Sequence, residues 1–152
     1  MIDKILEKKI IERLPYESSF KFVDNILDVN EDEITGTYTY TKENFFYKGH
    51  FKDNPVTPGI ILVETMGQIG IVSHIIYLLK LYETNQHFYP LLINGQNDYF
   101  KRVYIEEIMK VHAKKVYYRK NLLRSNVEMI NPKGEIVART TRLLKFIFDN
   151  NK

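Results

Sequence analysis

The chain has 152 residues, of which 44% are hydrophobic, and this length and composition predict a single globular domain, residues 1–152, with a sizeable core. Lys and Arg number 22 and Asp and Glu 19, so the net charge of 22 − 19 = +3 is weak support for nucleic-acid binding, and we expect none. The chain has no cysteine, which excludes disulfides, thiol nucleophiles and cysteine-based zinc sites.

The first part of the chain predicts a helix followed by a hairpin. Residues 2–13 place apolar side chains near helical spacing, and the charges among them are not typical of a secretory signal, so we expect a cytoplasmic protein. Alternating apolar residues predict strands over 19–29 and 34–40, joined by an Asn-Glu-Asp turn. Residues 44–58 contain Gly, Asn, Asp and Pro and are expected to form a structured loop.

Residues 59–82 predict a long helix that is apolar on all sides, and such a helix lies either in a protein core or in a membrane. Polar and ionisable residues, including Glu64 and His74, interrupt the apolar run, and ionisable groups are expensive at membrane depth. We therefore expect no membrane insertion and interpret this segment as a central helix wrapped by a sheet.

The rest of the chain, after a polar loop at 83–89, is rich in strand patterns. Strands are predicted over residues 91–97, 98–103, 107–119, 122–130 and 135–148. The sequence Asn131-Pro132-Lys133-Gly134 predicts a tight turn before the last of them. A long buried helix with about six strands, mostly joined as hairpins, indicates an α+β fold in which an antiparallel sheet curls around the helix.

The segment from residue 45 to residue 68 carries the candidate catalytic groups. His50 is the side-chain type best suited to moving a proton near neutral pH, and the apolar surroundings of Glu64 favour a protonated acid. Gly59 follows Pro58 at the predicted start of the helix, where free N–H groups can polarise a carbonyl oxygen. A base, an acid and an oxyanion site suit elimination of water from a 3-hydroxyacyl group. The residues alone leave structural roles for His50 and Glu64 open.

This segment resembles the FabZ/FabA-type 3-hydroxyacyl-[acyl-carrier-protein] dehydratases, which have the hotdog fold, an antiparallel β-sheet wrapped around a long central α-helix. The separation of 64 − 50 = 14 residues between His50 and Glu64 is that of the family. The family pattern G-H-F-P-x-x-P-x-M-P-G-V-L-x-x-E-A-M-A-Q is matched by Gly49, His50, Phe51, Pro55, Pro58, Gly59, Glu64, Met66 and Gln68. The likeness extends over nearly the whole chain, through Leu14-Pro15-Tyr16, Phe22-Val23-Asp24 and Phe100-Lys101-Arg102-Val103.

The resemblance implies a role for each residue of the motif. His50 would take the α-proton of the thioester, Glu64 would act on the 3-hydroxyl as general acid, and the Gly59 N–H would hold the thioester carbonyl. Gln68, one turn beyond Glu64, could orient it by a hydrogen bond. The reaction needs no cofactor and no metal.

The resemblance also implies partners and a substrate tunnel. The substrate would be a 3-hydroxyacyl chain linked through phosphopantetheine to an acyl carrier protein. Two subunits would pair their sheets as a homodimer or a trimer of dimers, with His from one chain and Glu from the other at each site. Candidates for the wall of an acyl tunnel along the dimer interface are Phe45, Phe51, Ile61 and Phe100.

The sequence departs from the family pattern at several positions. These are Lys52, Thr57, Ile61, Thr65, Gly67 and the segment 104–107. The departures favour a specialised relative, such as one from a polyketide or aryl-polyene pathway, or an altered tunnel. Two other functions stay open, a hotdog thioesterase acting on acyl-CoA or acyl-carrier protein, and a non-catalytic acyl-binding subunit that pairs with an active homologue.

Two further groups of residues have weaker signals. Basic residues are candidates for a surface that attracts an acidic carrier protein, although a solvated strand face of mixed charge explains them equally well: Lys101, Arg102, Lys114, Lys115, Arg119, Lys120 and Arg124. His74 and His112 lack partners at any metal-ligand spacing, and we interpret both as structural.

Overall fold

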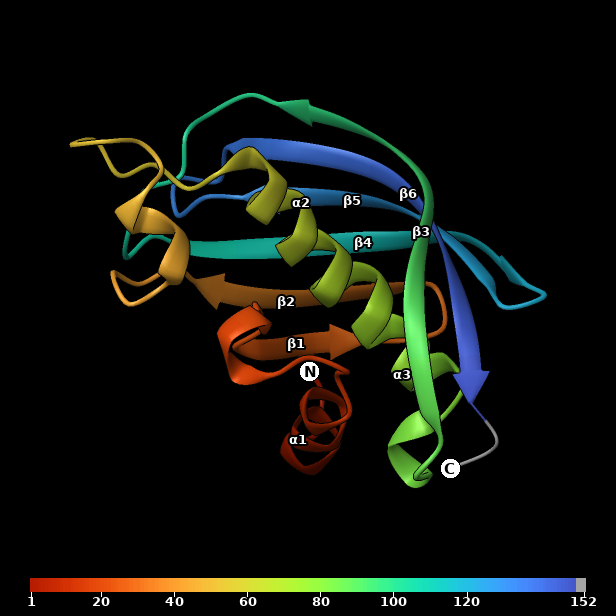
Figure 1. Ribbon diagram of the computed structural model, residues 1–152. Coiled ribbons are helices and arrows are strands. Elements are labelled where there is room, and N and C mark those ends of the chain that lie inside the picture. Colours follow the sequence, from red (N-terminus) through yellow and green to blue (C-terminus); the bar gives the residue numbers. More distant parts are fainter. Residues whose placement is uncertain (150–152) are drawn as a thin grey trace.

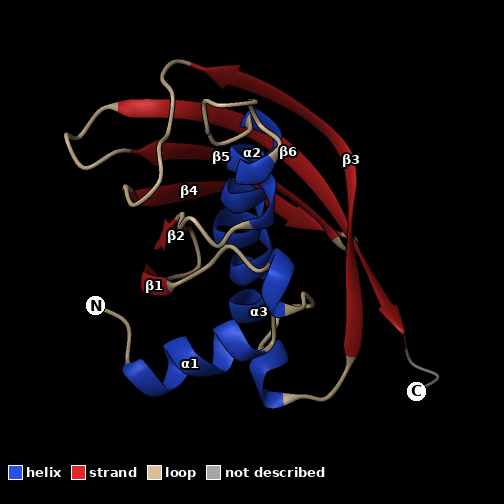
Figure 2. Ribbon diagram, turned by 60° about the vertical axis from the view of Figure 1, so that its left-hand side comes forward, coloured by secondary structure: helices blue, strands red, loops and turns tan. Residues whose placement is uncertain are grey.

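The computed structural model describes residues 1–149, in which a curved antiparallel sheet wraps around one long helix (Figures 1 and 2). Within these residues the sheet has six strands in the order β1-β2-β4-β5-β6-β3. The strands are β1 (Asn25–Val29), β2 (Glu33–Thr39), β3 (His87–Tyr99), β4 (Ile108–Arg119), β5 (Leu122–Ile130) and β6 (Ile136–Asp149). The predicted α+β arrangement is confirmed, and the β5–β6 turn closes as expected, with Gly134 at φ 80° donating its N–H to Asn131 O at 2.9 Å.

The central helix begins at Gly59 and ends at Leu78. It consists of α2 (Gly59–Gly67), a π-helical turn (Gln68–Val72) and α3 (Ser73–Leu78). The stretch is long and apolar enough to cross a membrane, but 83% of its most apolar window is buried inside the fold. Its apolar side chains therefore form the core against the sheet, as the sequence predicts for a central helix.

Gly70 allows the helix to approach the sheet closely. A Cβ on Gly70 would lie 2.8 Å from the Ala113 Cβ and 3.0 Å from the nearest methyl of Val127. We expect Gly70→Ala to lower the free energy of unfolding by about 1–3 kcal/mol, because overpacking outweighs the better helix propensity of alanine. Urea denaturation measures this change, with Gly49→Ala as control because its Cβ would meet open space. Equal stability of Gly70→Ala and the wild type would contradict the packing argument.

The N-terminal segment differs from its predicted structure. Helix α1 (Lys4–Glu12) lies where expected, but the strand predicted over 19–29 begins only at Asn25. Phe20 belongs instead to a short 3₁₀ helix, Ser18–Phe20. The reason is the side chain of Gln68, whose Oε1 accepts the Phe22 N–H at 2.7 Å and whose Nε2 donates to Phe20 O at 2.9 Å. These backbone groups bond to the central helix and not to a neighbouring strand. Two further 3₁₀ turns are Phe45–Lys48 and Leu81–Glu83.

Strand β3 forms one end of the sheet and also differs from the prediction. The sequence suggested two strands after a loop at 83–89, but one long strand runs from His87 to Tyr99 and pairs with β6. Its bulge between Leu92 and Asn94, and the proline within it, are features tolerated in edge strands. The edge is apolar, since Leu91, Leu92 and Ile93 are 50%, 54% and 49% exposed. A long apolar edge of this kind is suited to pairing with a strand of another chain.

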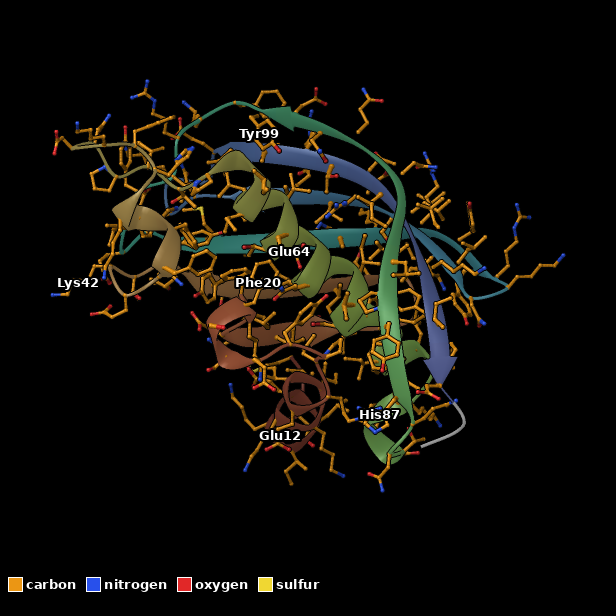
Figure 3. The ribbon with its side chains drawn as sticks, in the orientation of Figure 1. Glu12, Phe20, Lys42, Glu64, His87 and Tyr99 are labelled. Carbon is orange, nitrogen blue, oxygen red and sulfur yellow. The ribbon has the colours of Figure 1, made fainter. Side chains whose placement is uncertain are left out.

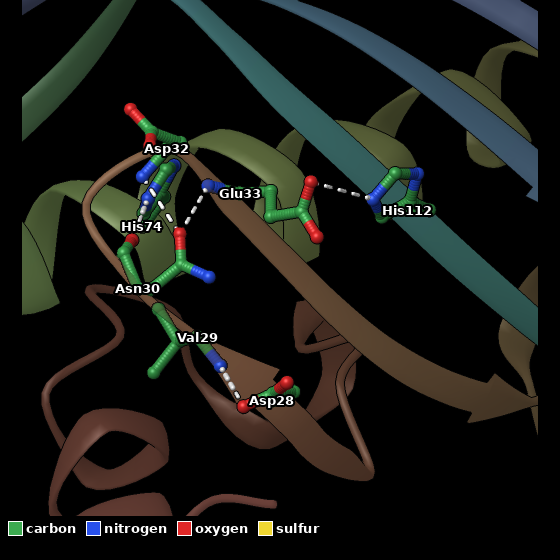
Figure 4. A network of polar contacts seen from close by, with 7 residues as sticks. All are labelled: Asp28, Val29, Asn30, Asp32, Glu33, His74 and His112. Atoms are coloured by element: carbon green, nitrogen blue, oxygen red, sulfur yellow. Dashed lines mark hydrogen bonds and ion pairs between the residues drawn. The ribbon is translucent and has the colours of Figure 1, made fainter.

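The β1–β2 turn is held by the polar network of Figure 4. Asn30 Oδ1 accepts the N–H groups of Asp32 and Glu33, at 2.8 Å and 3.0 Å. His74 Nε2 of the central helix donates to Asn30 O at 2.8 Å, and burial lowers the pKa of His74. His112 lies 3.6 Å from the Glu33 carboxylate. These contacts agree with the structural roles expected for both histidines.

Candidate active site

His50 lies in a hydrogen-bonded loop between the second 3₁₀ turn and the central helix. Its backbone O accepts the Val56 N–H at 2.9 Å, and Phe51 and Asn54 exchange two backbone hydrogen bonds of 3.0 Å. The imidazole stacks on the Phe51 ring, with 4.0 Å between the centroids. Thr57 N–H donates to Val103 O at 3.1 Å, which ties the end of the loop to the segment before β4.

The hydrogen bond of the His50 ring defines its tautomer. Nδ1 lies 3.0 Å from Val56 O, and a carbonyl oxygen can only accept, so Nδ1 carries the proton in the neutral ring. Nε2 then has a free lone pair. A half-buried imidazole with this arrangement is able to act as a general base.

Gly59 is the first residue of α2, as predicted. Pro58 precedes it in extended conformation and accepts the Ile61 and Leu62 N–H groups, at 2.9 Å and 3.2 Å. The N–H of Gly59 has no acceptor one turn earlier in the helix, and the positive end of the helix dipole lies here. The Tyr99 ring lies close by, 3.0 Å from where a Cβ of Gly59 would be, so this position accepts a larger residue poorly.

Glu64 lies on the face of the central helix turned away from the strands behind it, between Tyr99 and Phe20 in Figure 3. Gln68 Nε2 donates to Glu64 Oε1 at 2.9 Å, which is the contact expected from the sequence. Gln68 is itself fully buried and fixed by the backbone of the Phe20–Phe22 segment. The helix and the N-terminal segment therefore set the position of the carboxyl together.

Glu64 lines a pocket of about 340 Å³ beside the exposed edge strand. Its lining includes the polar side chains of Glu64, Tyr16 and Arg142 and is otherwise mostly apolar. The remaining lining residues are Pro15, Gly67, Val72, Tyr89, Pro90, Leu91, Leu92 and Leu144. His50 is not among them, so one chain does not bring the predicted base and acid to this pocket.

Tyr16 and Arg142 are pocket residues that the sequence reasoning missed. Burial, and next the negative charge of Glu64, raise the pKa of Tyr16. Burial lowers the pKa of the Arg142 guanidinium, and Glu64 opposes that shift. Arg142 Nη1 donates to Val63 O of the helix at 3.2 Å.

The four predicted tunnel residues lie in different surroundings. Phe45, Phe51 and Phe100 are each more than half exposed, and Ile61 is buried in the hydrophobic core. None of them lines the Glu64 pocket. Their place in a tunnel stays a prediction, since exposed aromatic residues are free to contact a second chain.

Two departures from the family pattern have a visible reason. Thr57 is buried and its hydroxyl hydrogen-bonds the hydroxyl of Tyr47, whose pKa burial raises to about 12. Thr65 is buried and its hydroxyl lies 2.6 Å from the hydroxyl of Tyr40. Each threonine supplies the partner that a buried tyrosine hydroxyl needs.

The basic residues do not gather on one surface. Lys101 and Arg102 precede β4, whereas Arg119 and Lys120 lie at its far end, and a strand of this length separates them by about 35 Å. Lys101, Arg102 and Lys133 line one surface pocket together with the carboxylates of Glu107 and Glu135, and Lys101 Nζ pairs with Glu135 at 3.0 Å.

We expect Gln68→Leu to lower the free energy of unfolding by about 2–4 kcal/mol, because it leaves the Phe22 N–H and the Phe20 carbonyl unsatisfied. It should also lower activity, since Glu64 loses its donor. Thr65→Val is the matched control, because it removes a buried hydrogen bond to Tyr40 from the same helix without touching Glu64. Loss of stability with unchanged kcat in Gln68→Leu would show that Gln68 does not position the acid.

Solved structures identify the fold. The chain has the hotdog fold, as the sequence indicated. It is similar to the dehydratase heterocomplex ApeI:P of Xenorhabdus doucetiae, with TM-score 0.75, 12% identity and 89% of each chain covered. It is also similar to the Escherichia coli PaaI protein of the phenylacetic acid degradation operon, with TM-score 0.59, 14% identity and coverage of 79% and 80%. At these identities the likeness concerns the fold alone.

Sequence relatives define the family. The FabA-like domain matches residues 14–141. The 3-hydroxyacyl-[acyl-carrier-protein] dehydratase FabZ of Caldicellulosiruptor bescii is 35% identical over 129 residues, 84% of this chain and 79% of the relative. The FabZ protein of Clostridium perfringens is 29% identical over 128 residues, with the same coverage. The chain therefore belongs to the FabA-like family and is a FabZ-type hotdog dehydratase.

Proposed function

We propose that this protein eliminates water from a 3-hydroxyacyl thioester carried on acyl carrier protein, with His50 as base and Glu64 of a partner subunit as acid. The observation that carries the proposal is that His50 and Glu64 are each held by hydrogen bonds in a form suited to proton transfer. The hydrogen bond to Val56 leaves His50 Nε2 free, and Gln68 holds Glu64 in a pocket. We place the reaction in the cytoplasm, where FabZ-type biosynthesis of acyl chains would supply the substrate.

The proposed step balances without a cofactor. His50 Nε2 accepts the proton from C2, and the electron pair of that bond first forms an enolate with the thioester carbonyl and then becomes the C2–C3 double bond. The C3–O bond breaks with its electron pair on oxygen, which takes the Glu64 proton to leave as water. The Gly59 N–H stabilises negative charge on the thioester oxygen. His50 is left protonated and Glu64 ionised, and proton exchange with water resets both.

A dimer formed at strand β3 would complete the site. Residues of this strand, Tyr89 to Leu92, line the Glu64 pocket and also lie at the exposed edge of the sheet. Antiparallel self-pairing of this edge about a two-fold axis would bring a partner chain onto the pocket. The partner's loop would then supply the base that the pocket lacks within one chain.

The carrier protein would dock near the His50 loop. Lys101, Arg102 and Lys133 line a surface pocket in a region that the Thr57–Val103 hydrogen bond joins to this loop. Positive charge there would attract the phosphate of the phosphopantetheine arm and an acidic carrier surface.

The test is turnover of a 3-hydroxyacyl thioester by the purified protein. Appearance of the conjugated enoyl thioester, by absorbance and mass, is the expected result. Release of free thiol from a saturated acyl thioester would instead support a thioesterase. Turnover that appears only after mixing with an active homologue would support a non-catalytic partner subunit.

A further inference from the structure

Arg142 is a charged residue on the buried face of the sheet. It lies on β6 between Thr140 and Leu144, which point to the same face and are 3% and 6% exposed. Its guanidinium reaches the central helix, where Nη1 donates to Val63 O at 3.2 Å. A cation in such a position is expensive unless a ligand or partner compensates it.

One glycine makes room for this side chain. A Cβ on Gly67 of the helix would lie 3.1 Å from Arg142 Nη1, which is closer than ordinary contact, whereas a Cβ on Gly95 of β3 would lie at an ordinary contact distance of 3.4 Å from Arg142 Cγ. Gly67 stands where the family pattern has alanine, so the departure at this position is physically linked to the half-buried arginine. The central helix therefore leaves space for the guanidinium at Gly67.

The charge of Arg142 is not neutralised by direct contact. Glu64 and Arg142 line the same pocket and interact electrostatically, but within residues 1–149 no ion pair joins them. Arg142 Nε is buried and, in the same residues, has no hydrogen-bond partner. A pocket that contains a carboxyl, a guanidinium and several apolar side chains suits a hydroxyl group on an apolar chain.

We propose that Arg142 binds the 3-hydroxyl oxygen of the substrate opposite Glu64 and stabilises the negative charge on this oxygen as the C3–O bond breaks. This role rests on the proposed dehydration. One lone pair of the oxygen accepts the Glu64 proton and the other accepts an N–H of the guanidinium. Arginine stays protonated throughout, so the balance of the reaction is unchanged.

The experiment compares Arg142→Gln with the wild type on two probes, the 3-hydroxyoctanoyl and octanoyl thioesters of N-acetylcysteamine. We expect kcat for dehydration to fall about 100-fold, as for loss of an oxyanion donor. The inhibition constant of the octanoyl thioester, which has no 3-hydroxyl, should change less than about threefold, because the apolar side chains of the pocket are unchanged. Gly67→Ala should lower kcat about tenfold by displacing the guanidinium.

Chemical rescue distinguishes loss of the guanidinium group from misfolding of the variant. Added guanidinium ion should restore at least about tenfold activity to Arg142→Ala, which it cannot do for a misfolded chain. Arg139→Gln is the matched control, an exposed arginine on the opposite face of β6, and should keep wild-type kcat. Wild-type kcat in Arg142→Gln would overturn the role of Arg142 but not the proposed function. The same would follow if kcat for dehydration and the binding of the octanoyl thioester fell by equal factors. Absence of dehydration in the wild type overturns the proposed function together with the role of Arg142.

Discussion

His50→Asn is expected to lower kcat for dehydration by about 1,000-fold, because it removes the base while preserving the fold of the loop. Asparagine keeps an amide N–H near the position of Nδ1, so the hydrogen bond to Val56 O can still form. The measurement is the initial rate of enoyl formation at saturating substrate, with thermal unfolding of both proteins as a check on structure.

His112→Asn is the control for that experiment. His112 lies on β4 and pairs with Glu33 far from the loop, so its replacement should leave kcat unchanged. A His50→Asn protein within about threefold of wild-type kcat would contradict its role as base, since general bases contribute far more.

Glu64→Gln is expected to lower kcat by about 100- to 1,000-fold while leaving α-proton abstraction intact. The amide has the shape of the carboxyl and can still accept a hydrogen bond from Gln68, so the pocket should be unchanged. Exchange of the C2 hydrogens in deuterium oxide, followed by mass spectrometry, measures proton abstraction separately from elimination. We expect exchange to persist in Glu64→Gln and to vanish in His50→Asn.

Glu128→Gln supplies the control for the acid. Glu128 is a carboxylate on β5 that pairs with Arg139 away from the pocket, so both exchange and elimination should match the wild type. Loss of C2 exchange in Glu64→Gln together with its persistence in His50→Asn would reverse the two assigned roles.

The sequence predicted the architecture because the spacing of apolar residues shows which segments bury one face and which are buried on all sides. The all-apolar helix begins at Gly59 as expected but ends at Leu78 and not at residue 82, and the strands β4, β5 and β6 lie within one residue of their predicted ends. The strand predicted at Phe20 failed because the side chain of Gln68, distant in sequence, takes its backbone groups. Strand β3 was underestimated because an exposed edge strand lacks the apolar alternation of a half-buried one.

The site was predictable only where local sequence defines it. Gly59 at the helix start and Gln68 beside Glu64 follow from positions along one segment. Arg142 comes from the far end of the chain, and no local motif marks it. One sequence feature could have indicated it. Side chains alternate along β6, so Arg142 lies on the same face of the sheet as the buried Leu144 and Phe146.

The departures from the family pattern acquire physical meaning in the fold. Thr57 and Thr65 satisfy buried tyrosine hydroxyls, and Gly67 admits the Arg142 guanidinium. Thr65 and Gly67 lie on the same helix as the predicted acid, and none of the three changes replaces it.

The most direct test of the account is a mixed dimer of His50→Asn and Glu64→Gln chains. The two chains are co-expressed with different tags and purified through both tags, and enoyl formation from a 3-hydroxyacyl thioester is measured. A site that takes its base from one chain and its acid from the other is restored at one of the two positions, so the mixed dimer should have about half of wild-type activity. A mixed dimer as inactive as either variant alone would contradict the shared site.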